Sequence, residues 1–64
     1  MDDSKFRGKV NRAISDAYSI ARELEEIANG IQSEFKGIGS DQCASSLRSA
    51  AQKYRNVSST LRRL

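Results

Sequence analysis

The stretch FKGIGSDQC, residues 35–43, decides the fold because it places two glycines between two long amphipathic segments. Gly37 or Gly39 can adopt the left-handed backbone conformation that commonly ends a helix. The chain contains no proline, so these glycines are the strongest local interruption of its helical pattern. The stretch therefore predicts a sharp bend between two helices.

Ser40 and Asp41 are suited to the start of the second helix. The hydroxyl of Ser40 can accept a hydrogen bond from an otherwise unpaired backbone N–H at a helix N-terminus. The carboxylate of Asp41 favours the positive end of the helix dipole. A short connection makes the two helices antiparallel neighbours. We expect one helical-hairpin domain over residues 1–64, with a helix at about 4–36, a turn at 37–39 and a helix at about 40–63.

Apolar residues before the bend recur at alternating spacings of four and three. This is a heptad pattern, which lines one side of a helix with apolar side chains. A second row recurs every seven residues and widens this side to that of a core-facing bundle helix. The first row is Phe6, Val10, Ala13, Ala17, Ile20, Leu24, Ile27 and Ile31, and the second is Ile14, Ala21, Ala28 and Phe35.

The same pattern returns after the bend. Its apolar residues are again separated alternately by four and three, and two alanines flank the row. No strand-like alternation runs for more than a few residues, so the predicted fold class is all-α. The row is Cys43, Leu47, Ala50, Tyr54, Val57, Leu61 and Leu64, flanked by Ala44 and Ala51.

Gly30 leaves a second possibility for the first helix. A glycine inside a helix costs about 1 kcal/mol relative to alanine, so the helix could end at Gly30 and leave 31–39 as a long loop. Ile31 and Phe35 stay in phase with the apolar rows, which favours the longer helix.

A chain of 64 residues has room for one small domain, and such domains usually need a disulfide, a structural metal or association. One cysteine and no histidine exclude an internal disulfide and a standard zinc site. The broad apolar side therefore predicts a four-helix bundle, as a homodimer or as a heterodimer with another helical protein. The expected interface residues are Val10, Ala17, Ile20, Leu24, Ile27, Ile31, Leu47, Tyr54 and Leu61.

Seven cations are expected to meet at one end of the antiparallel hairpin. They are Lys5, Arg7, Lys9, Arg12, Arg55, Arg62 and Arg63. Three interpretations stay open for this basic end: a solvated surface, a site for an acidic protein and a site for nucleic acid. The absence of interleaved aromatic residues, which would stack on bases, weighs against nucleic acid.

Three residues have both a structural and a functional interpretation. Phe35 is expected to pack as core at the bend, and the alternative is a residue that recognises a partner directly. Cys43, near a helix N-terminus, is expected to be a small buried hydrophobe rather than a reactive thiol. Tyr54 fills either the core or an interface, because its hydroxyl needs a partner or an edge position.

The sequence contains no constellation typical of an enzyme, such as a nucleophile beside a base or a phosphate-binding glycine loop. We therefore expect no catalysis, no cofactor and no small-molecule substrate. No apolar run resembles a signal peptide or approaches the roughly 20 residues of a membrane span. We expect a cytoplasmic protein, or one exported without a cleaved signal peptide.

An aromatic-x-Gly turn between two such helices resembles the WXG-type superfamily of small helical hairpins, which are associated with type VII secretion in Gram-positive bacteria. Phe35, Lys36 and Gly37 stand where the Trp-x-Gly turn would lie. The segment IGSDQCASSLRSAAQKYRNVSSTLRRL is similar to the second helix of the small proteins encoded with larger LXG-type toxins. The resemblance implies a dimerising adaptor, or a partner of a larger secreted protein such as an LXG-type toxin.

The chain departs from that superfamily in three features. Phenylalanine replaces the tryptophan, and the chain is shorter than is usual there. The Tyr-x-x-x-acidic export signal is missing, since Tyr54 is followed four positions later by Ser58 and Tyr18 by Arg22. The resemblance therefore implies an adaptor rather than the bearer of the signal. The alternative is a small basic regulatory protein that binds nucleic acid or an acidic protein through its charged end.

Overall fold

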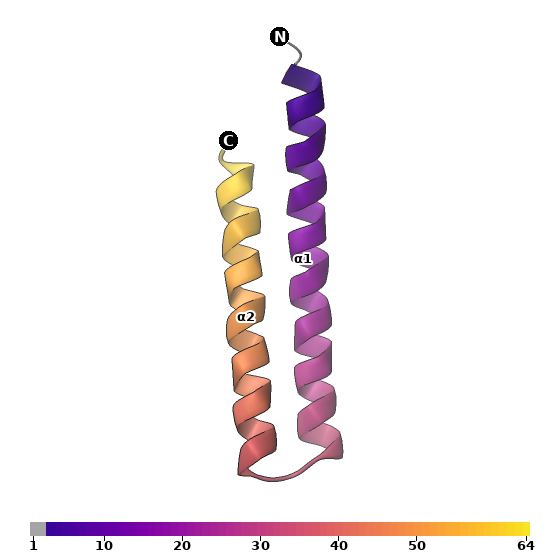
Figure 1. Ribbon diagram of the computed structural model, residues 1–64, viewed down its shortest axis with the longest axis vertical. Coiled ribbons are helices and arrows are strands. Elements are labelled where there is room, and N and C mark those ends of the chain that lie inside the picture. The colour runs from indigo at the N-terminus through magenta and orange to yellow at the C-terminus, as the bar shows by residue number, and fades with distance from the viewer. Residues whose placement is uncertain (1–2) are drawn as a thin grey trace.

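The computed structural model describes residues 3–64 as two antiparallel helices joined by a short bend (Figure 1). Helix α1 spans Asp3–Glu34 and helix α2 spans Ile38–Arg62. The described residues contain no strand, so the prediction of an all-α hairpin is confirmed. Helix α1 continues through Gly30, and the alternative of a loop over 31–39 is wrong.

The bend lies at 35–37, slightly before the predicted position. Gly37 has a φ of 152°, a conformation that side chains strongly disfavour, and it caps α2. Its carbonyl accepts a hydrogen bond from the Asp41 N–H at 3.1 Å. The prediction that Ser40 caps α2 is wrong, because the helix begins at Ile38 and no side chain caps it. Gly39 and Ser40 thus lie within the first turn of α2.

The two helices contact one another through a row of small side chains, which we call the hairpin seam. Four of its alanines are fully buried and two further small residues are nearly so. No large side chain is fully buried in the chain that the structure describes. Small side chains let two helices approach closely but bury little apolar area. The seam residues are Ala17, Ala21, Ala28, Ala44, Ala51 and Ser58.

Heptad positions assigned from the seam divide the surface of the hairpin into two faces. The a positions are Ile14, Ala21 and Ala28 in α1, and Ala44, Ala51 and Ser58 in α2. The d positions are Val10, Ala17, Leu24 and Ile31, and Ser40, Leu47, Tyr54 and Leu61. The e positions border the seam on one face, and the g positions border it on the other.

The face at the e positions is polar and fixes the register of the helices. Arg48 donates hydrogen bonds from Nη2 to Asn29 Oδ1 at 2.7 Å and to Gln32 Oε1 at 2.6 Å. Arg55 forms a two-bond ion pair with Glu25, with one bond at 2.8 Å. Because bidentate bonds tolerate little misalignment, these contacts select one register of the hairpin.

Ser58 is the one polar side chain among the buried residues that the structure describes. Its hydroxyl donates a hydrogen bond to the backbone carbonyl of Ile14 at 3.3 Å, which is longer than the usual range of O–H···O bonds and makes this a weak bond.

We expect Ser58→Ala to leave the free energy of unfolding within about 0.5 kcal/mol of the wild type. The loss of a long hydrogen bond is offset by the higher helix propensity of alanine and by its fit among alanines. Urea denaturation followed by circular dichroism measures this difference. A loss of several kcal/mol would show that the bond determines the hairpin geometry.

Candidate functional site

The face at the g positions is apolar and exposed, and with the d positions it forms what we call the open face. The e-position side chains of the two helices meet on the polar face, so the g positions of both lie on the opposite one. Ile20 is 38% exposed, Ile27 52% and Val57 49%. The residues of the open face are Phe6, Val10, Ala13, Ile20, Leu24, Ile27, Ile31, Cys43, Leu47, Ala50, Tyr54, Val57, Leu61 and Leu64.

Eight of the nine predicted interface residues lie on the open face. Ala17 is the exception, since it is 6% exposed and belongs to the hairpin seam. Tyr54 is 40% exposed, which matches the edge position expected for its hydroxyl rather than a place in the core. Phe6, Val57 and Leu64 also lie on this face, although they were assigned only to the apolar rows.

The amount of exposed surface is large for a chain of this mass. A folded monomer of 7.1 kDa is expected to expose about 4,100 Å², whereas the hairpin exposes 5108 Å². Its radius of gyration is 15.3 Å, against roughly 11 Å for a globular domain of this length. The excess of about 1,000 Å² is what a single layer of two helices leaves uncovered.

The dimensions of the hairpin suit a protein interface. The Cα atoms extend 54 Å along the helices and 15 Å across them, which gives each flat face a footprint of roughly 800 Å². Each partner in a standard protein–protein interface contributes about this area. The open face could therefore hold one hairpin of equal length.

The ion pair between Arg55 and Glu25 was not predicted, because Arg55 was assigned to the basic end. It is the one ion pair among the side chains that the structure describes. The hydrogen bond from Arg55 lowers the pKa of Glu25, and its positive charge acts in the same direction. Counting residues outward from the bend would not have paired them, because Glu25 lies ten residues before Phe35 and Arg55 lies 18 residues after Gly37.

This ion pair predicts a pH dependence of stability. The pKa of Glu25 is lower in the folded chain than its ordinary value of 4.5. The stabilisation is thus present above that value and is lost as the pH falls through the folded-state pKa. At pH 7 we expect the wild type to have a higher melting temperature than Glu25→Gln, and this difference should vanish near pH 2. Thermal denaturation followed by circular dichroism measures both melting temperatures.

Glu26→Gln is the matched control, because Glu26 is the neighbouring exposed carboxylate. It should change the melting temperature much less at pH 7. If Glu25→Gln and the wild type have the same melting temperature at neutral pH, the ion pair contributes no stability, as is found for many partly exposed pairs.

The bend exposes more apolar surface than expected. Phe35 is 64% exposed and Ile38 is 79% exposed, so the prediction that Phe35 packs as core is wrong for this chain. The bend is the end of a two-helix layer, and no third element lies beyond it in the described residues. Phe35, Lys36 and Gly37 form the bend itself, at the place of the aromatic-x-Gly turn.

Cys43 is exposed on the open face, and the prediction of a buried hydrophobe is also wrong for this chain. It occupies a g position near the bend, where no side chain of the other helix covers it. A cysteine at such a position is buried only if another chain packs on the open face.

The basic end contains six of the seven predicted cations. Lys5, Arg7, Lys9 and Arg12 lie on α1 and Arg62 at the end of α2, with Arg63 next to it. All six are exposed and none forms an ion pair with a side chain that the structure describes. Arg55 is half-buried at mid-height of the hairpin, where Glu25 neutralises it.

Two other kinds of functional feature are absent from the described residues. No group of cysteine and acidic side chains there could hold a metal ion. No described helix is long and apolar enough to cross a membrane. The open face is therefore the largest candidate functional feature of residues 3–64.

Comparisons with known proteins add no relative on which a function could be based. The resemblance to WXG-type hairpins accordingly rests on the sequence pattern alone. No family model, no curated protein and no solved structure matches the chain.

Proposed function

We propose that this chain is a protein interaction module whose open face is covered by a second copy of the chain, giving a four-helix bundle. The observation that carries the proposal is the exposure of Ile20, Ile27 and Val57, which lie at g positions on one face of the hairpin. Monomeric proteins rarely expose apolar patches of more than a few hundred Å². A second copy matches the length of the face and presents the same mixture of small and large side chains.

The pattern of burial within the hairpin supports this assignment. The hairpin seam is made of alanine and serine, whereas the isoleucines, leucines and Tyr54 lie at or near the open face. Most of the apolar area that could stabilise the fold therefore becomes buried only on association. The bundle core would form from the d and g positions of both copies.

We further propose that the bundle acts as an adaptor or partner of a larger secreted protein, as the WXG-type resemblance implies. The support is the aromatic-x-Gly bend at Phe35–Gly37, together with the heptad periodicity of the two helices. The alternative of a basic regulator of nucleic acid has less support, because Arg55 is paired with Glu25 away from the basic end.

Sedimentation equilibrium at micromolar concentration tests the association. We expect a mass twice that of the chain and a helical circular dichroism spectrum. A mass above one chain only when a second protein is added would identify a heterodimer instead. A stably helical monomer would contradict the proposal, since the open face would then remain in water.

The adaptor role is tested in a Gram-positive host that encodes the chain. Tagged chain, wild type or Ile20→Asp, is expressed with and without a functional type VII secretion apparatus. We expect a larger secreted protein to copurify with the wild type only, and its export to need both the chain and the apparatus. Unchanged export without the chain would refute the adaptor role while leaving the association intact.

A further inference from the structure

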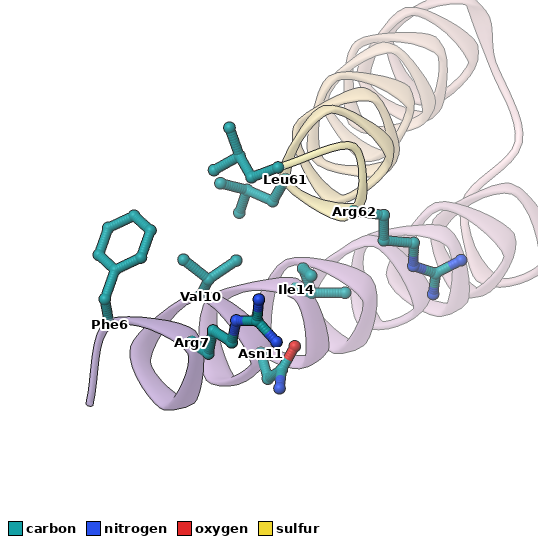
Figure 2. A pocket seen from close by; sticks show the side chains of 8 residues that line it. Phe6, Arg7, Val10, Asn11, Ile14, Leu61 and Arg62 are labelled. Carbon is teal, nitrogen blue, oxygen red and sulfur yellow. The ribbon is translucent and has the colours of Figure 1, made fainter. Parts of the chain in front are cut away.

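At the open end of the hairpin, opposite the bend, α1 extends beyond α2 and leaves a hollow of about 620 Å³ (Figure 2). Its floor is aliphatic, and Val10 of α1 and Leu61 of α2 approach one another across it. Phe6 stands at its outer edge. The lining residues are Phe6, Arg7, Val10, Asn11, Ile14, Leu61, Arg62 and Leu64.

The hollow exists because the two helices differ in length. Ser58 bonds Ile14 across the seam, and α2 ends four residues later at Arg62. In the opposite direction α1 continues eleven residues to Asp3. It therefore passes the end of α2 by roughly seven residues, or about 10 Å. Along this length no residue of α2 faces the inner side of α1.

The sides of the hollow are positively charged. Arg7 comes from α1 and Arg62 from α2, so the two helices each place a guanidinium beside the aliphatic floor. No carboxylate that the structure describes pairs with either arginine. Lys5, Lys9, Arg12 and Arg63 belong to the same end of the hairpin without lining the hollow, and they add to the positive potential there.

We propose that this hollow binds an acidic amphipathic helix of a partner protein. An apolar side chain of that helix lies on Val10, Ile14 and Leu61, and carboxylates beside it pair with Arg7 and Arg62. The planar guanidinium suits carboxylates geometrically. The aliphatic floor favours a peptide over nucleic acid, which would place its phosphates on the cations and leave the floor uncovered.

This site overlaps in part with the association surface proposed above, because Phe6, Val10, Leu61 and Leu64 line the hollow and also belong to the open face. Arg7 and Ile14 occupy a positions, and Asn11 and Arg62 occupy e positions, so none of the four belongs to the open face. A second copy on the open face would cover that part of the floor and leave the side formed by Arg7, Asn11, Ile14 and Arg62 accessible to the partner helix. The bundle would then bind the acidic helix of the partner protein at the end of the hairpin opposite the bend.

The probe is a synthetic 21-residue helical peptide with leucine at its a and d positions and glutamate beside them. A peptide of the same composition in scrambled order controls for charge alone. Fluorescence anisotropy of the labelled peptides measures affinity for the full chain. We expect saturable binding of the amphipathic peptide, weakened by salt, and much weaker binding of the scrambled one.

Charge reversals locate the bound peptide. Arg7→Glu and Arg62→Glu should each weaken binding about tenfold, since an attractive pair becomes repulsive at the hollow. Lys5→Glu and Arg63→Glu make the same change in net charge close by but outside the lining, and should weaken it less than about threefold. All four variants should retain the helicity and sedimentation of the wild type.

Two results would overturn the proposal. One is equal weakening by all four reversals, or equal binding of both peptides, which would reveal only a diffuse basic surface. The other is a duplex DNA of similar charge binding more tightly than the amphipathic peptide. Neither result bears on the association of the chain, which sedimentation measures independently.

Discussion

Replacing Ile20 with aspartate is expected to abolish association of the chain and most of its helicity at micromolar concentration. Ile20 lies near the middle of the open face and is 38% exposed in the single hairpin. On association it would become buried, and an unpaired carboxylate there would cost several kcal/mol. We expect the association constant to fall at least about 100-fold, and sedimentation with circular dichroism measures both effects.

Ser19→Asp is the matched control for this prediction. Ser19 is the preceding residue in the same helix and is exposed away from the open face. The substitution changes charge and helix propensity in a similar way but should leave the assembly intact. If Ile20→Asp sediments as wild type does, the open face is not the interface.

Replacing Ala21 with leucine is expected to destabilise the hairpin by about 1–3 kcal/mol, because a fully buried alanine leaves no room for three further carbons. In a domain of this size, such a loss lowers the melting temperature by roughly 5–20 °C. The leucine would push α2 away and break the contacts that fix the register. Thermal denaturation followed by circular dichroism measures the shift.

Ala13→Leu adds the same volume at a g position and serves as the control. Ala13 is exposed on the open face, so its leucine can extend the apolar surface without displacing α2. We expect an unchanged or raised melting temperature. Should both substitutions lower it equally, the seam would not run along the a positions.

The fold could be predicted closely because its signals are local. The heptad spacing on both sides of residues 35–43 predicts two helices of matching period, and Gly37 with its positive φ forms the bend. The predicted cap at Ser40 failed because the backbone of Gly37 completes the bend by itself. Helix α2 therefore begins at Ile38, before Ser40, and has no side-chain cap.

The candidate site was predicted in part. The interface residues were found because large apolar side chains dominate the open face, whereas Ala17 and Arg55 were misplaced. Ala17 was misplaced because the sequence does not specify which part of the apolar side of α1 faces α2. Arg55 was misplaced because the sequence does not specify which residues of α2 lie at the height of a given residue of α1. That register depends on the bend and on pairs such as Arg55 with Glu25.

The amino-acid order alone was enough to specify two amphipathic helices, a bend between them and an apolar surface too broad for a hairpin to cover. Helical period and glycine conformation depend on neighbouring residues, so they can be read along the chain. Tertiary packing decided that the a-position alanines, together with Ala17, join the helices, while the large side chains at the d and g positions stay partly or fully exposed. The a positions and the d and g positions are all largely apolar in sequence. Only the close approach of α1 and α2 shows which of them are buried between the helices.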